Sequence, residues 1–138
     1  MKLLSFIFLI TSTTLSAQLT RDADRLKNLD YMVRLGSKIN CDSTGGSNLE
    51  HKICLNKEFQ KADSIVNVTY LESLNFVESD SLKKELIKIQ TQWVKNRHTQ
   101  AIIRASGYRG HLLGIRYLSY MLLATQNRNQ ELKTLSLD

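Results

Sequence analysis

Proline is absent from the 138 residues of the chain, and cysteine occurs only twice. Sandwiches and barrels of β-strands usually need prolines in their turns, whereas helices joined by short Gly, Ser and Asn loops need none. The hydrophobic fraction of 42% and the charged fraction of 23% argue against intrinsic disorder and against a polytopic membrane protein. The composition therefore favours an all-α fold, and the length suits one compact domain.

A long apolar run is found only at the N-terminus, where Lys2 precedes the mostly apolar residues 3–10 and a small polar stretch ends at Ala17. This arrangement is typical of a signal peptide over residues 1–17. The apolar run has about half the length that a membrane-spanning helix needs, and no cysteine near the cleavage site offers a lipid anchor. We therefore expect a periplasmic or secreted protein without stable membrane insertion.

Cys41 and Cys54 are the only cysteines, and in an oxidising compartment a disulfide between them is the default expectation. The bond would close residues 42–53, which include a flexible Ser, Thr and Gly stretch, and would restrain this loop at both ends. The alternative is a metal site formed by both cysteines and His51, but three ligands without a fourth nearby are poor spacing for zinc. The sequence shows no other metal or cofactor motif, so we expect neither group.

The spacing of apolar residues predicts a compact bundle of about four helices at residues 20–35, 48–76, 82–105 and 111–135. Residues 64–70 contain several β-branched side chains and would suit a strand, but apolar residues continue at helical spacing on both sides of them without a turn signal. The first half of the last helix is apolar on nearly every side, which indicates that this helix is the most central.

The residues expected on the buried faces share three- and four-residue spacing within each helix. They are Leu26, Leu29, Met32 and Val33 in the first helix; Ile53, Phe59, Ala62, Val66, Tyr70 and Leu74 in the second; Leu86, Ile89, Trp93 and Val94 in the third; and Leu112, Ile115, Leu118, Leu122, Thr125 and Leu132 in the fourth.

Two rows of residues at helical spacing place polar groups beside these apolar faces. The rows are Asp63, Asn67 and Tyr70 in the second helix, and Gln90, Trp93 and Arg97 in the third. Because buried polar groups are costly unless they are paired, we expect the rows to meet, with Arg97 paired to Asp63 and with Gln90 or Asn67 bonded to neighbouring groups. The alternative is that both rows are solvated beside the core.

At these rows the sequence resembles the LprI-type lysozyme inhibitor N-terminal domains, a family of small secreted bacterial domains. The runs Asp63-x-x-Val66-Asn67-x-x-Tyr70 and Gln90-x-x-Trp93-x-x-x-Arg97 carry most of the resemblance, together with Cys41, Glu50, Cys54, Leu86, Thr125, Arg128, Glu131 and Leu132. The resemblance implies a disulfide-bridged helical domain over residues 41–135. The expected helical extension at residues 18–40 lies outside the resemblance. The member that gives the family its name implies inhibition of lysozyme.

The sequence departs from the family pattern at three positions. His98 stands where the family often has an acidic residue, and Ala101 and Tyr120 stand where it often has a second cysteine pair. The joint absence of that pair fits the loss of a second disulfide and supports a bond between the two cysteines that remain. We assign a structural role to the polar network of Asp63, Asn67, Tyr70, Gln90, Trp93, Arg97, Thr125 and Arg128.

Acidic residues are missing from residues 94–130, whereas residues 41–93 contain eight of them beside six lysines. The basic half could meet anionic envelope polymers or an acidic protein partner, or it could simply be solvated. Nucleic acid is a poor candidate for an exported protein. Many lysozymes are themselves basic, so an inhibitor with this charge would need its acidic half at the contact.

Nothing in the sequence points to catalysis, because the histidines at positions 51, 98 and 111 have no neighbouring motif that would orient them. We expect a binding protein that acts as a lysozyme inhibitor, with an envelope-associated binding module as the alternative. For lysozyme the candidate contact residues are Asp42 and Glu50 in the disulfide loop. For anionic polymers they are Arg104, Arg109 and Arg116.

Overall fold

The computed structural model describes residues 34–43 and 46–135, and three long helices make up most of this part of the chain. They are α3 (Asn48–Phe76), α4 (Asp80–Ala105) and α5 (Gly110–Thr134), and no strand occurs among the described residues. The all-α prediction is confirmed. The expected signal peptide and all but the end of the expected helix at residues 20–35 lie outside the described residues. None of the described helices is long and apolar enough to cross a membrane.

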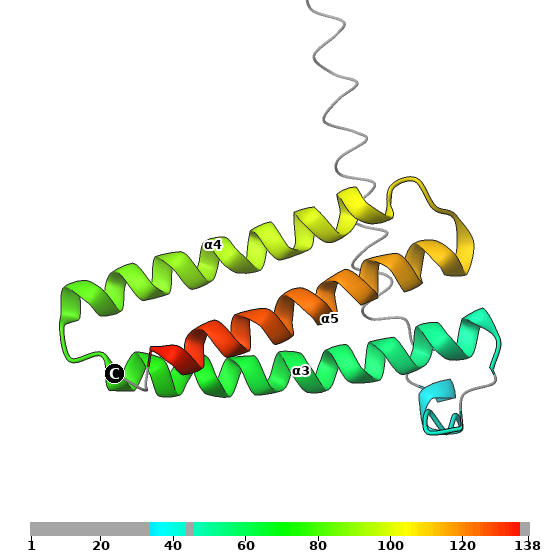
Figure 1. Cartoon of the computed structure of the whole chain (residues 1–138), viewed down its shortest axis with the longest axis horizontal. Coiled ribbons are helices and arrows are strands. Elements are labelled where there is room, and N and C mark those ends of the chain that lie inside the picture. Colours follow the sequence, from blue (N-terminus) through cyan, green and yellow to red (C-terminus); the bar gives the residue numbers. More distant parts are fainter. Residues whose placement is uncertain (1–33, 44–45, 136–138) are drawn as a thin grey trace, which may run out of the picture.

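The central helix of the bundle is α5, as its apolar first half predicts. It packs along α3 on one side and along α4 on the other, whereas α3 and α4 make few direct contacts (Figure 1). In this arrangement α3 and α5 run in the same direction and α4 runs against both. Side chains that reach across the bundle are therefore needed to join α3 to α4.

Serine caps fix where two of the helices begin. Ser47 precedes α3 and its hydroxyl accepts a hydrogen bond from the backbone N–H of Glu50, and Ser79 does the same for Leu82 at the start of α4. These bonds satisfy backbone donors that a helix start otherwise leaves without partners. The cap at Ser79 starts α4 at Asp80, two residues before the predicted start, while the bounds of α3 agree with the prediction.

The described core consists of two clusters at different heights of the bundle. The larger contains Ile53, Phe59, Ala101, Ala105, Tyr117, Leu118 and Met121. The smaller contains Val66, Leu86 and Leu132, with Tyr70, Leu74, Val77 and Trp93 packed against it. Among the residues expected to be buried, Leu26, Leu29, Met32 and Val33 lie outside the described residues.

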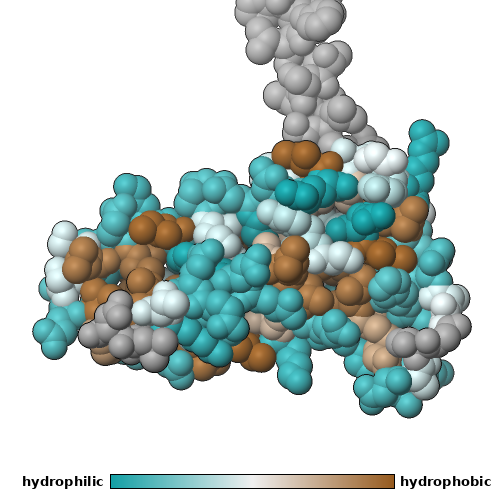
Figure 2. Space-filling model, viewed as in Figure 1, coloured by the Kyte–Doolittle hydropathy of each residue, from teal (hydrophilic) through white to brown (hydrophobic). Residues whose placement is uncertain are grey.

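The prediction of burial is wrong for three of the expected core residues. Ile89, Val94 and Leu112 are 47%, 43% and 43% exposed, and they belong to a wider set of exposed apolar side chains that Figure 2 shows as separate brown patches. The reason is geometric. Because α4 packs mainly against one neighbour, it buries a single narrow stripe, and Ile89 and Val94 beside that stripe remain at the surface. Leu112 belongs to the first turn of α5.

Candidate functional site

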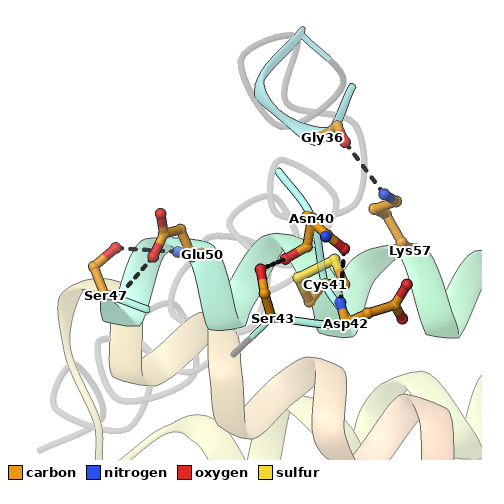
Figure 3. The surroundings of a disulfide bond; sticks show 9 residues. Gly36, Asn40, Cys41, Asp42, Ser43, Ser47, Glu50 and Lys57 are labelled. Atoms are coloured by element: carbon orange, nitrogen blue, oxygen red, sulfur yellow. Dashed lines mark hydrogen bonds between the residues drawn. A yellow bond between two sulfur atoms is a disulfide. The ribbon is translucent and has the colours of Figure 1, made fainter. Parts of the chain in front are cut away.

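A disulfide joins Cys41 to Cys54, with an S–S distance of 2.08 Å and a Cα–Cα distance of 5.6 Å. It ties the chain before α3 to the second turn of that helix (Figure 3). The predicted bond is confirmed. Since each sulfur is bonded to the other, neither is available as a metal ligand, and the alternative with His51 is excluded. No metal-binding group of His, Cys, Asp and Glu occurs anywhere in the described ranges.

Hydrogen bonds hold the segment around Cys41 in place on both sides of the disulfide. The Asn40 side-chain oxygen accepts from the backbone N–H of Asp42 at 3.0 Å, and the Ser43 hydroxyl donates to the Asn40 carbonyl at 3.3 Å. On the other side of the bond, the Lys57 ammonium of α3 donates to the Gly36 carbonyl at 3.2 Å (Figure 3). The segment is thus braced by its own hydrogen bonds and tied to α3 at two points, the disulfide and the Lys57 bond.

The Glu50 side chain is hydrogen-bonded to the backbone at the start of α3. Its carboxylate accepts a hydrogen bond of 2.7 Å from the backbone N–H of Ser47, while the Ser47 hydroxyl accepts from the Glu50 N–H at 3.3 Å. This reciprocal pair is a capping box. The side chain that the sequence offered as a contact residue is therefore also part of the helix cap, and its removal would disturb α3.

A hollow of about 720 Å³ lies between the disulfide-linked segment and the first turns of α3. Its lining includes Cys41, Cys54, His51 and the two acidic residues Glu50 and Glu58. Asp42 is exposed next to Cys41. We call this part of the molecule, residues 38–43 and 46–58, the disulfide end of the bundle.

Arg97 links all three helices from its place in the middle of α4. One guanidinium nitrogen, Nη1, donates to Asp63 Oδ1 of α3 at 2.6 Å and to Thr125 Oγ1 of α5 at 2.7 Å. Its guanidinium carbon lies 4.6 Å from the ring centroid of Trp93 and 5.4 Å from that of Phe59. The pairing of Arg97 with Asp63 that the sequence predicted is present, and it supplies the link between α3 and α4.

A second arginine, Arg128 of α5, continues the network towards the other end of the bundle. Its Nε donates to Gln90 Oε1 at 3.0 Å and its Nη1 to Glu131 Oε2 at 2.9 Å. The guanidinium lies 5.9 Å from the Trp93 ring, so that this half-buried tryptophan contacts both arginines.

Two of the eight residues assigned to the network lie apart from it. Asn67 is exposed, and Tyr70 is half-buried against the smaller core cluster. Two other polar residues of α3 bond to α5. The Thr69 hydroxyl donates to Asn129 Oδ1 at 2.6 Å, and the Ser73 hydroxyl donates to the Leu132 carbonyl at 3.1 Å. Sequence spacing gave no signal for Thr69 or for Phe59 beneath Arg97, because both positions also suit ordinary core residues.

The Thr125 hydroxyl connects Arg97 to the backbone of α5, since it also donates to the Met121 carbonyl at 2.6 Å. Thr125 is fully buried. Thr125→Val keeps the shape but removes the acceptor, and we expect it to lower the free energy of unfolding by about 1 to 3 kcal/mol, measured by urea denaturation. Thr91 makes the same bond to the carbonyl four residues earlier but is exposed, so Thr91→Val is the matched control. Equal effects of both variants would contradict a role for the buried hydroxyl.

The residues at which the chain departs from the family pattern are integrated into the packing. His98 Nδ1 is 3.0 Å from the Tyr117 hydroxyl. Ala101 is fully buried in the larger core cluster, and Tyr120 packs against the same cluster. Side-chain packing thus occupies the place where the family often has a second disulfide.

The basic candidate residues lie at a different place in the bundle. Arg104 is in the last turn of α4, Arg109 immediately precedes α5, and Arg116 is on the first half of α5. All three are exposed. In Figure 1 the connection between α4 and α5 lies at the same end of the bundle as the disulfide-linked segment, with the start of α5 between them. The structure therefore does not bring the acidic and basic candidate residues together.

A comparison with known protein families shows to which of them the chain is related. The family model described as lysozyme inhibitor LprI matches residues 40–132, which is more than half of the chain. The chain belongs to this family. The match begins just before the disulfide and includes the whole arginine network, so the LprI region and the described bundle nearly coincide. No curated protein and no solved structure matches the chain.

The description of the LprI family as lysozyme inhibitors is consistent with a protein that is not an enzyme. A family of lysozyme inhibitors is also consistent with a location outside the cytoplasm, as the N-terminal sequence predicts.

Proposed function

We propose that the protein is an exported binding protein that inhibits lysozyme through the disulfide end of the bundle and catalyses no reaction itself. The observation that carries the proposal is the bond between Cys41 and Cys54, which fixes an exposed segment beside an open hollow in a chain of the LprI family. Loops that are ordered before binding lose little conformational entropy in the complex. The disulfide and the hydrogen bonds of Asn40, Ser43 and Lys57 provide that order.

The disulfide end is less basic than the chain as a whole, because residues 38–43 and 46–58 contain three acidic residues beside three lysines. The full chain has a net charge of +6 at pH 7, which would slow its encounter with a basic enzyme if charge were spread evenly. Asp42 and Glu58 are exposed at the disulfide end, and neither takes part in a described ion pair. We infer that these two carboxylates face the enzyme, while Glu50 mainly holds the start of α3.

Turnover of lysozyme in the presence of increasing amounts of the purified protein tests the proposal. We expect turnover to fall in a saturable manner with protein concentration, and the inhibition to weaken as salt concentration rises because exposed charges are screened. Unchanged turnover at every protein concentration and at low salt would contradict inhibition.

A double variant tests which end makes the contact. Asp42→Lys with Glu58→Lys is expected to raise the concentration for half-inhibition by about tenfold or more, since each 1.4 kcal/mol of lost binding free energy corresponds to about a tenfold change in affinity. Glu72→Lys with Glu78→Lys makes the same change of charge at exposed sites elsewhere and is the control. Equal weakening by both pairs would show that only net charge matters and would contradict a contact at the disulfide end.

A further inference from the structure

The connection between α4 and α5 carries cations without acidic partners. The sequence has no Asp or Glu from residue 94 to residue 130, and in the described part of the chain no carboxylate pairs with Arg104, Arg109 or Arg116. The two arginines of the interior, Arg97 and Arg128, by contrast each bind a carboxylate. The exposed arginines therefore present their full charge to the surroundings.

Two of these arginines are held by tyrosines. The guanidinium carbon of Arg104 lies 4.6 Å from the ring centroid of Tyr120, and that of Arg116 lies 5.0 Å from the centroid of Tyr108. The pairs cross between segments, because Arg104 reaches from α4 to α5 and Tyr108 reaches from the connection to α5. Since Arg116 and Tyr120 are one turn apart on α5, the two pairs adjoin on one face.

Stacking on a ring leaves a guanidinium ready to bind an anion. The interaction uses the face of the planar group and leaves its N–H donors at the edge for an external acceptor. Tyr108 and Tyr120 are half-buried, so their rings are held in place by the bundle. Contact with such a ring restricts an arginine side chain that would otherwise have many rotamers. Figure 2 shows strongly hydrophilic residues gathered over the C-terminal end of α4.

We propose that Arg104, Arg109 and Arg116 form a binding surface for the phosphate groups of an anionic envelope polymer. Guanidinium groups match the oxygens of phosphate with paired hydrogen bonds, which favours phosphate over a diffuse negative charge. In Figure 1 this connection lies at the same end of the bundle as the disulfide-linked segment but on the other side of α5, so the two proposed contacts use different faces of that end. This function does not depend on inhibition of lysozyme.

Binding of the purified protein to immobilised polymers tests the proposal. One arm uses lipopolysaccharide and a second uses lipoteichoic acid, both of which carry phosphate, and a third uses a polymer of glutamate, which carries only carboxylates. We expect binding to at least one phosphate-bearing polymer, weaker binding to polyglutamate, and a loss of affinity as salt rises. The arm that binds identifies the source of the phosphate. Binding to no phosphate polymer at low salt, or equal binding to polyglutamate, would overturn the proposal.

Three double variants locate the surface. Arg104→Gln with Arg116→Gln is expected to weaken polymer binding by about tenfold or more, while inhibition of lysozyme stays at the level of the unmodified protein. Lys84→Gln with Lys88→Gln removes the same charge from the other half of α4 and should leave most of the binding intact. Arg104→Lys with Arg116→Lys keeps the charge and should still weaken binding, because lysine cannot form the paired bonds. Equal losses in the arginine-to-glutamine and lysine-to-glutamine pairs would overturn the proposal.

Discussion

Replacing Asp63 with leucine is expected to lower the free energy of unfolding by about 3 to 5 kcal/mol, the range found when one partner of a buried ion pair is removed. The variant leaves the guanidinium of Arg97 without its anion at a site where Arg97 is only 6% exposed. The same change frees α3 from α4, which have few other contacts. Urea denaturation followed by circular dichroism measures the effect.

Substitutions of the two partners of this pair should have unequal effects on the free energy of unfolding. Arg97→Met leaves Asp63, which is 27% exposed and can be hydrated, so its effect should be smaller than that of Asp63→Leu. Combining both substitutions removes both charges, and the double variant should be more stable than Asp63→Leu alone. The Nε of Arg97 is already buried without a hydrogen-bond partner, which adds to the cost of keeping the arginine.

An exposed ion pair provides the control for these variants. Glu85 and Lys88 form such a pair at 3.5 Å, and Glu85→Leu should change the free energy of unfolding by less than about 1 kcal/mol. Should Asp63→Leu have an effect as small as this, the contact between Asp63 and Arg97 would behave as a surface pair, and its structural role would be refuted.

Removing the disulfide is the second change with a large expected effect. Cys41→Ala with Cys54→Ala should lower the free energy of unfolding by about 3 kcal/mol, because the cross-link restricts the unfolded chain over a sequence separation of 13 residues. Thermal unfolding of the variant, compared with the unmodified protein in the presence and absence of reductant, measures this effect.

The disulfide variant also separates stability from function. At a temperature where it remains folded, we expect its inhibition of lysozyme to be weaker, because the segment around Cys41 must then be ordered on binding. Reductant should weaken inhibition by the unmodified protein in the same way and should not change inhibition by the variant. Full inhibition by a folded variant without the bond would contradict the proposal that a restrained segment carries the contact.

The helices of this protein were predictable because their ends carry local signals. The bounds of α3 follow from Ser47 at its start and the polar break after Phe76, and its β-branched middle stays helical because both flanks continue the spacing. The exposure of Ile89 and Val94 in α4 was not predictable. Periodicity shows which side of a helix is apolar, but the width of the buried stripe depends on how many neighbours that helix has in the fold.

Parts of the site followed from the sequence for a similar reason. Asp63 and Arg97 were paired because each lies in a polar row beside an apolar face, and burial of such rows requires partners. The role of Glu50 could have been found from the Ser47-x-x-Glu50 spacing, which is that of a capping box. Glu58 had no such signal, since its position beside the hollow depends on where the segment before α3 folds back.

The central claim is that the disulfide end of the bundle binds lysozyme. The most direct test is a titration of isotope-labelled protein with lysozyme, followed by the chemical shifts of its backbone amides. We expect saturable changes in residues 40–43 and in the exposed residues of the first turns of α3, including Glu58, with little change near Arg104 and Arg116. Changes confined to the connection between α4 and α5, or no saturable change at any amide, would contradict the claim.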